Sequence, residues 1–457
     1  MAAALCSFHV RQTTLVAAPP EPPASQQDPR DRGPHHQRNE SPDDIVVVSA
    51  VRTPSTRARK GGLKDTPPDD LVVAVLREAL HRAGIKADEV GDVCLGSVFP
   101  PSSKRANEVR SALLLAGFPD SVPAYTVNRQ CAAGLQAIAN VAANIRAGYY
   151  DIGIAGGIEH LSKDPLDWKG SDNPRVLESQ DAQEVGMTLG LTAENVAERF
   201  GVSREVQDRY AAASHSKAAA AQARAPMLPP LLLRPAGESR HVSVDADDGI
   251  RPDSTKQKLG ALKPYFKKAG TVTAGNACQR PARRGLPVMA HAALLCGGGR
   301  PPGVMGTAPA IAIPKALARA GLSKDDVEVY ELNEAFASQF AYCMRELGLP
   351  DDKVNPNGGA IALGHPAGAT GARQTVTLLH ELARRIRGST ISSSESSGSL
   401  GSAPTMASSP CAPAPRMGAA AVFECSGSSL NGSSLGSSIM SSDASQDRPA
   451  DASAEAA

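Results

Sequence analysis

The sequence predicts an α/β fold with mostly parallel sheets. Short apolar runs, such as those at 45–48, 93–98 and 151–155, alternate with amphipathic or alanine-rich stretches that suit helices. This alternation is typical of parallel strands joined by crossover helices. With 457 residues and a hydrophobic fraction of 41%, the chain is long enough for two similar-sized units or one large composite fold.

The first elements follow a regular pattern. The β-branched run at 45–48 suits a strand that is buried on both faces. Thr66 is expected to cap the next helix, with Pro67 in its first turn and an apolar stripe along one face. A long alanine-rich helix is expected from Cys131 to about Arg146.

The pattern loosens between 160 and 275, where only 203–224 is clearly helical. A second α/β half resumes near residue 310, continues through 327–332 and carries a helix at 370–386. The stretch at 392–409 has almost no apolar content and low strand propensity.

These changes in composition divide the chain into five regions. A disordered or targeting extension is expected first, and a low-complexity tail last, because both lack apolar periodicity. The regions are the extension at 1–42, an N-terminal half at 43–165, a loop or excursion domain with the end of the N-terminal half at 166–275, a C-terminal half at 276–425 and the tail at 426–457.

Charge and cysteine usage exclude several classes of protein. Lys and Arg total 48 and Asp and Glu total 47, so no strong field favours nucleic acid or an anionic membrane as a partner. No apolar run approaches the roughly 20 residues that span a bilayer. The eight cysteines are scattered without metal-binding spacing, which argues against a metal site and favours a reducing compartment.

One cysteine stands in a setting that favours chemistry. Cys131 lies where a turn opens a helix, and the free N–H groups and dipole at such a position favour the thiolate over the thiol. The small residues at 132–134 leave room for a ligand beside the sulfur. The alternative is an inert buried cysteine at the start of a helix.

A histidine in a glycine-rich segment is the natural partner of such a cysteine. His365 lies within the segment 355–373, whose glycines allow the backbone to pass close to a substrate. Alone it could be structural, but beside a thiolate it becomes a candidate general base. Asn333, at the end of a strand, either caps the following helix or presents its amide to a reacting carbonyl.

These segments, in this order and at these separations, resemble the signatures of the thiolase family. The stretches at 195–200 and 271–276 extend the resemblance, which covers about 43–279 and 303–385. The sequence Val-Asn-Arg-Gln-Cys that ends at Cys131 is most similar to the 3-ketoacyl-CoA thiolases of the peroxisome. The resemblance implies two similar βαβαβαββ-type halves, packed as α-β-α-β-α layers, with an inserted loop domain.

The resemblance also implies a reaction and roles for individual residues. Thiolases cleave a 3-ketoacyl-CoA with free CoA to give acetyl-CoA and a shortened acyl-CoA. Cys131 would hold the acyl group, His365 would take the thiol proton, and Asn333 would position a water that completes an oxyanion site. Ala274 and Cys278 would lie along the pantetheine arm, where Cys278 replaces the serine of the family. CoA is then a co-substrate, and no permanently bound cofactor or metal is implied.

The sequence departs from the family's pattern in two stretches, at 280–303 and 388–416. The family has a second catalytic cysteine, which activates the incoming thiol, and Cys411 is the candidate for it. Pro413 stands where the family has a glycine whose N–H stabilises the thioester oxyanion, and proline has no N–H to donate.

The resemblance implies a homodimer acting in fatty-acid β-oxidation, with the peroxisome as the expected compartment and the mitochondrion as the alternative. Arg11 and Gln12 begin a peroxisomal address of the N-terminal kind, but the closing residues of that address are missing. Two other functions stay open. The chain could bind acyl-CoA without catalysis, or it could be a biosynthetic or sterol-carrier-type thiolase.

Overall fold

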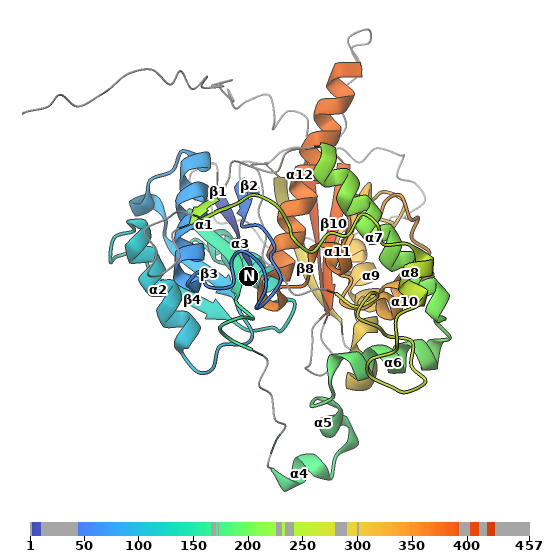
Figure 1. The fold of residues 1–457 in the computed structure, drawn as a ribbon. Coiled ribbons are helices and arrows are strands. Elements are labelled where there is room, and N and C mark those ends of the chain that lie inside the picture. Colours follow the sequence, from blue (N-terminus) through green and yellow to red (C-terminus); the bar gives the residue numbers. More distant parts are fainter. Residues whose placement is uncertain are drawn as a thin grey trace, which may run out of the picture.

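The structure of the protein is a computed structural model in which helices surround and separate the strands of one mixed sheet (Figure 1). It describes residues 2–10, 44–165, 171, 173–224, 231–233, 242–278, 290–298, 301–392, 403–410 and 418–425.

The large sheet has nine strands in the order β4-β3-β5-β1-β2-β8-β11-β10-β9. Parallel pairs join β3 to β4 and β5, and β10 to β9, whereas the strands in the middle of the sheet pair antiparallel. The strands are β1 (Ala2–Val10), β2 (Ile45–Arg52), β3 (Asp92–Gly96), β4 (Ala124–Val127), β5 (Ile152–Glu159), β8 (Ala290–Gly298), β9 (Val329–Leu332), β10 (Ala403–Pro410) and β11 (Gly418–Cys425).

The helices form three layers and a separate group. The layers contain α1 (Pro68–Ala83), α2 (Lys104–Ala116), α3 (Ala133–Arg146), α9 (Pro309–Ala320), α10 (Ala337–Leu347) and α12 (Thr370–Ser392). Short turns are η2 (Ala87–Glu89), η3 (Pro302–Thr307), α11 (Ala360–Leu363) and η4 (Ala367–Ala369).

One outer layer, formed by α1 and α2, covers the N-terminal strands. Val93 and Leu95 of β3 lie in one apolar cluster with Leu76 of α1 and Leu113 of α2. The intervening Cys94 faces the opposite side of the sheet and packs in the cluster that contains α3. Alternating side chains of one strand therefore contact helices on both faces, as expected for a fully covered strand.

The C-terminal strands are covered in the same way. Ala420 and Val422 of β11 pack with Ile313 of α9, while Ala421 and Phe423 face the cluster that contains α3 and α12. Since α3 and α12 lie between the strands of the two halves, the layers run α1/α2, strands, α3/α12, strands, α9/α10. This is the layered α-β-α-β-α fold that the resemblance to thiolases implies.

The helix predicted to follow Thr66 is present as α1, but its cap differs from the expectation. Pro67 occupies the N-cap position of α1, and no side chain caps that end. Because the helix begins at Pro68, the cap position falls on Pro67, one residue after Thr66, and proline has no side-chain oxygen to accept a backbone N–H. The backbone carbonyl of Thr66 instead contacts Nε2 of His160 at 2.9 Å.

Three expectations about strands are corrected. The region 1–42 was expected to contain no strand, but Ala2–Val10 forms β1 between β2 and β5. The stretch at 392–409 was expected to disfavour a strand, but Ala403–Pro410 forms β10 between β9 and β11. Backbone pairing on both sides explains both results, because ladder hydrogen bonds do not depend on side-chain propensity. The same antiparallel additions make the sheet mixed rather than mostly parallel.

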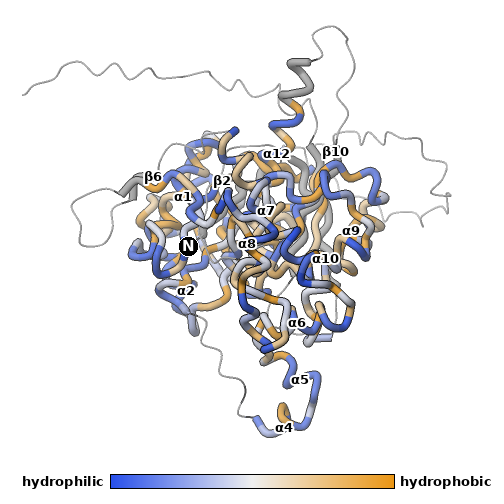
Figure 2. The backbone as a smooth tube through the Cα atoms, turned by 45° about the vertical axis from the view of Figure 1, so that its right-hand side comes forward, coloured by the Kyte–Doolittle hydropathy of each residue, from blue (hydrophilic) through white to orange (hydrophobic). Residues whose placement is uncertain are grey.

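The separate group of helices comes from the part of the sequence between the two halves. It contains α4 (Pro174–Leu177), α5 (Gln180–Glu184), α6 (Leu189–Phe200), α7 (Arg204–Arg224), α8 (Lys256–Gly260) and a small sheet of β6 (Leu231–Leu233) with β7 (Val242–Val244). Figures 1 and 2 both show α4 and α5 reaching away from the main body. Within the parts of the chain that the structure describes, no helix combines the length and apolar character needed to cross a membrane.

Candidate active site

Cys131 lies in the turn between β4 and α3, two residues before the helix begins. Gln130, directly before it, has a φ of 50°, a left-handed conformation that is uncommon for a residue with a side chain. The turn is held by Asn128, whose Oδ1 accepts from the N–H of Gln130 at 2.9 Å, and by the N–H of Ala133, which donates to the carbonyl of Gln130 at 2.9 Å. A conformation that costs about 1–3 kcal/mol is therefore kept directly before the cysteine.

His365 lies between α11 and η4, and its imidazole faces Cys131. Nε2 of His365 lies 2.9 Å from Sγ of Cys131, and both residues are buried. Nδ1 of His365 lies 2.7 Å from Oγ1 of Thr370. If Nδ1 donates to the threonine hydroxyl, Nε2 is left free to accept the thiol proton. The predicted pairing of this cysteine with this histidine is present.

Glycines allow the two halves to approach closely enough for this pairing. A Cβ on Gly134 would lie 2.8 Å from the backbone oxygen of Gly368 and 2.8 Å from the nitrogen of Ala372. A Cβ on Gly371 would lie 2.4 Å from the nitrogen of Leu135. The start of α3 and the turn after His365 are thus in backbone contact, which any larger residue would prevent.

Apolar side chains surround the sulfur. Cys131 packs in a small cluster with Met305 and Ala367, which the partly buried Val98, Phe99 and Leu189 complete. These residues come from η3, η4, the loop after β3 and the start of α6, so four segments that are separate in the sequence converge at Cys131. Such surroundings exclude water and strengthen electrostatic interactions with a reacting group.

Asn333 follows β9 and is fully buried. Its backbone carbonyl accepts from Nε2 of Gln339 at 2.8 Å. Neither Oδ1 nor Nδ2 of its amide has a hydrogen-bond partner among the described residues. Asn333 does not cap the following helix, because the N-cap of α10 is Phe336. The expectation that Asn333 caps the following helix is therefore wrong. Its buried amide could form hydrogen bonds with a substrate or a water.

The predicted pantetheine loop lies beside the segment that carries Asn333. The N–H of Cys278 donates to the carbonyl of Ala335 at 3.1 Å, and the N–H of Ala337 donates to the carbonyl of Asn276 at 2.9 Å. Asn276 also donates through Nδ2 to Asp208 of α7 at 3.0 Å. Ala274 is exposed and Cys278 is half-buried, so both are accessible to a ligand.

Cys411, the candidate for the second catalytic cysteine, lies outside the described residues, as do Pro413 and the pair Arg11 and Gln12. Among the residues that the structure does describe, no group of His, Cys, Asp and Glu side chains is arranged to hold a metal ion.

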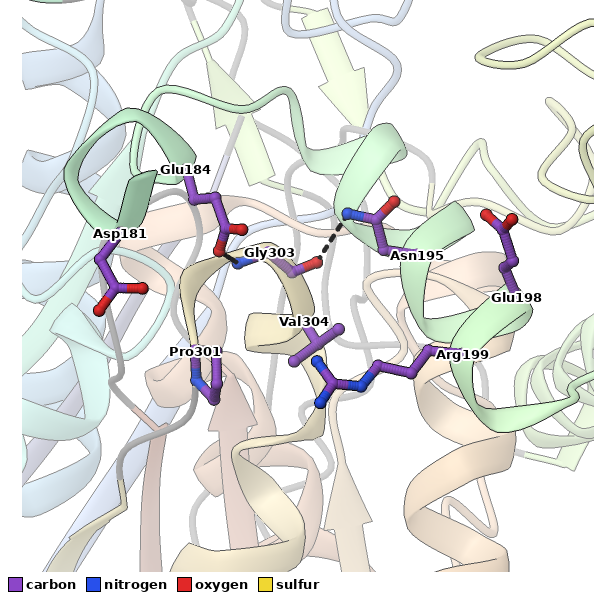
Figure 3. Close-up of a pocket in the computed structure, with 8 residues that line it drawn as sticks. All are labelled: Asp181, Glu184, Asn195, Glu198, Arg199, Pro301, Gly303 and Val304. Atoms are coloured by element: carbon purple, nitrogen blue, oxygen red, sulfur yellow. Dashed lines mark hydrogen bonds between the residues drawn. The ribbon is translucent and has the colours of Figure 1, made fainter. Parts of the chain in front are cut away.

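A pocket of about 300 Å³ is lined by residues of α5, α6 and η3 (Figure 3). The N–H of Gly303 donates to Glu184 at 2.8 Å, and Nδ2 of Asn195 donates to the carbonyl of Gly303 at 3.1 Å. Cys131 and His365 do not line this pocket, so it is not the site of the chemistry. Its lining residues are Asp181, Glu184, Asn195, Glu198, Arg199, Pro301, Gly303 and Val304.

Two residues of the site were not predicted from the sequence. Thr370 could have been found from its hydroxyl, which stands five residues after His365 at the start of a helix. Met305 gave no signal, because a methionine near a proline-rich stretch is usually an ordinary packing residue. Their roles become visible only when the separate segments are brought together.

A layered α/β fold with a buried cysteine–histidine pair where its halves meet defines an enzyme that works by covalent thiol catalysis. Comparison with known proteins narrows this class. The model of the thiolase N-terminal domain matches residues 45–280, and that of the thiolase C-terminal domain matches 286–408. The chain belongs to the thiolase family.

Individual relatives agree with this assignment. The peroxisomal 3-ketoacyl-CoA thiolase 2 of Arabidopsis thaliana is 48% identical over 364 residues, which is 75% of this chain and 79% of the relative. The peroxisomal 3-ketoacyl-CoA thiolase A of Mus musculus is 48% identical over 367 residues, or 76% of this chain and 86% of the relative. The crystal structure of the dimeric peroxisomal thiolase of Saccharomyces cerevisiae matches with a TM-score of 0.74 and 34% identity, covering 84% of this chain and 98% of that one.

Proposed function

We propose that this chain is a 3-ketoacyl-CoA thiolase, which uses CoA to cleave a 3-ketoacyl-CoA into acetyl-CoA and a shortened acyl-CoA in fatty-acid β-oxidation. The observation that carries the proposal is the 2.9 Å contact between Nε2 of His365 and Sγ of Cys131. It couples a nucleophile to a base within the distance that proton transfer requires.

The first half of the reaction forms an acyl-enzyme. The thiol of Cys131 gives its proton to Nε2 of His365, and the thiolate attacks the keto carbon of the substrate. The bond between C2 and C3 then breaks, and its electron pair leaves with the acetyl-CoA part as an enolate. The thiol of Cys411 would protonate that enolate, which releases acetyl-CoA and leaves a thioester on Cys131.

The second half transfers the acyl group. The thiol of a new CoA gives its proton to the Cys411 thiolate and attacks the thioester carbon, and the Cys131 thiolate leaves and takes its proton back from His365. We assign activation of this second thiol to Cys411. The amide of Asn333, which has no partner among the described residues, would hold a water that forms an oxyanion site together with His365.

CoA acts in this scheme as a co-substrate, and the chemistry requires no permanently bound cofactor. The exposed Ala274 and half-buried Cys278 would line the pantetheine arm. Lysines concentrate between residues 256 and 268, and the N–H of Tyr265 in that stretch donates to the carbonyl of Val272 at 3.0 Å. A positive stretch bonded to the base of the loop suits the phosphates of CoA.

The assembly would be a homodimer. Strand β4 ends the large sheet, and all four of its residues are only partly buried, so one side of its backbone is available for pairing with another chain. The similar yeast structure is described as dimeric. The relatives are peroxisomal, and we propose the same compartment for this chain. We also propose the division into regions that the sequence predicts from residue 43 onward.

The proposal is tested by comparing the purified protein with its Cys131→Ala variant. The thiolysis of 3-ketoacyl-CoA is monitored by absorbance. The wild-type protein should consume 3-ketoacyl-CoA in the presence of CoA, and the variant should not. Mass spectrometry after exposure to acyl-CoA should find the acyl adduct on Cys131. Binding of acyl-CoA without turnover or adduct would instead identify a non-catalytic binding protein, and a panel of chain lengths separates the thiolase subtypes.

A further inference from the structure

Glu159, the last residue of β5, is a buried carboxylate that the proposed chemistry does not use. Its Oε2 accepts from the N–H of Gly368 at 2.9 Å and from the N–H of Val98 at 3.0 Å. Its Oε1 accepts from the N–H of Phe99 at 3.2 Å and from Oγ of Ser97 at 3.3 Å. One carboxyl group therefore joins the loop after β3 to the turn η4 of the other half.

The groups that Glu159 joins both adjoin the reactive pair. Gly368 lies in the turn that directly follows His365, and no other residue fits there, because a Cβ would lie 2.5 Å from Cα of Ser97. Val98 and Phe99 contribute side chains to the apolar cluster around Cys131. Displacement of this carboxylate would therefore act on the position of the imidazole and on the wall beside the sulfur.

Burial makes the charged form of the Glu159 carboxyl group unfavourable. Burial raises the pKa of Glu159 to about 7, and the charge of Arg105 and the N–H donors oppose part of this rise. Arg105 itself donates to Oγ of Ser97 at 3.3 Å and to Asp164 at 2.6 Å. Buried carboxylates with strongly perturbed pKa values occur more often at functional sites than elsewhere.

We propose that Glu159 is a positioning residue of the thiolase reaction, which holds the turn after His365 against the N-terminal half so that Nε2 stays in reach of Sγ of Cys131. This inference rests on the proposed function, because it concerns the same cysteine–histidine pair. A residue that served the fold alone would affect stability without altering the reactivity of the sulfur.

The test compares Glu159→Gln and Glu159→Leu with the wild type at pH 8. Glutamine keeps the shape but presents an NH₂ group to an N–H donor in either orientation, whereas leucine removes every acceptor. Asp247→Asn is the control, because Asp247 is another buried carboxylate that accepts a backbone N–H, from Ser55 at 2.8 Å, and lies outside the proposed site.

Two readouts separate positioning from stability. The first is the rate at which iodoacetamide alkylates Cys131, followed by mass spectrometry with Cys278 as the internal reference. The second is the division of the thiolysis rate into kcat and KM. A displacement of about 1 Å can reduce turnover by roughly 100-fold. We therefore expect kcat and the alkylation rate to fall about 10-fold in Glu159→Gln and about 100-fold in Glu159→Leu, with KM changed less than about twofold.

The results distinguish a positioning role of Glu159 from a purely structural one. Wild-type rates in Glu159→Gln would overturn the proposal even if Glu159→Leu failed to fold. Equal slowing in Asp247→Asn would also overturn it, because a general loosening would then explain the effect. Slower alkylation in the Glu159 variants alone, with no turnover by any of the proteins, would support the positioning role and reject the thiolase function.

Discussion

The outer layers of the molecule and the seam between its halves are built on different principles. In the outer layer of α1 and α2, large apolar side chains such as Leu76 and Leu113 fill the space between helix and sheet. At the seam, backbone meets backbone through Gly134, Gly368 and Gly371. The outer layers therefore supply stability through buried apolar area, whereas the seam supplies the accuracy with which two reactive side chains meet.

Polar groups reinforce this contrast. Besides Glu159, a second buried carboxylate, that of Glu334, lies near His365 within the C-terminal half and accepts from Ser214 at 2.6 Å, from Asn355 at 2.8 Å and from the N–H of Ile361 at 3.2 Å. Burial raises the pKa of Glu334, and these donors oppose the rise. Buried carboxylates thus bond the backbone on both sides of His365. Substitutions at the seam should change activity, and substitutions in the outer layers should change stability.

The largest effect is expected from His365→Ala. Without the imidazole, the Cys131 thiol has no base at 2.9 Å, and a general base contributes about 100- to 10,000-fold to a rate. We expect kcat for thiolysis to fall by about 1,000-fold, with little change in the midpoint of thermal unfolding. Activity within tenfold of the wild type would mean that another group takes the thiol proton.

Leu76→Ala, in the outer layer, should reduce stability and leave the activity unchanged. Leu76 is fully buried, and truncation of such a leucine reduces the free energy of unfolding by about 2–5 kcal/mol. Urea denaturation should detect this loss, while kcat per folded molecule stays at the wild-type value. A fall in kcat without loss of stability would break the proposed separation between the two regions.

A smaller effect on stability, accompanied by loss of activity, is expected from Gly134→Ala. The added methyl group would meet backbone atoms at 2.8 Å, which move only if α3 and the turn after His365 separate. We expect a loss of about 1–3 kcal/mol in the free energy of unfolding and a reduced kcat. Gly260→Ala is the control for the free energy of unfolding, since the nearest atom to its Cβ is Oδ2 of Asp208, at 4.0 Å.

The sequence predicted the elements that depend on local order. Strand β2, helix α3 and helix α7 appear where apolar runs and helical periodicity place them. Both partners of the reactive pair, Cys131 and His365, were also predicted from the residues around them. Local sequence carries this information because helix periodicity, strand burial and glycine turns act over a few residues.

Strands β1 and β10 could not be predicted in this way. Their pairing partners, β2 and β5 for β1 and β9 and β11 for β10, supply the hydrogen bonds that their own composition does not signal. The same reason explains the links made by Glu159, whose importance depends on groups 60 residues and more away.

By itself, the sequence determined the alternation of strands and helices, the reactive residue types and the glycines that permit close approach, because each is a property of a short segment. Only the tertiary structure decided that Sγ of Cys131 and Nε2 of His365 stand 2.9 Å apart across 234 residues of chain. That distance depends on the packing of α3 against α12 and of each half against the other, which no local pattern can specify.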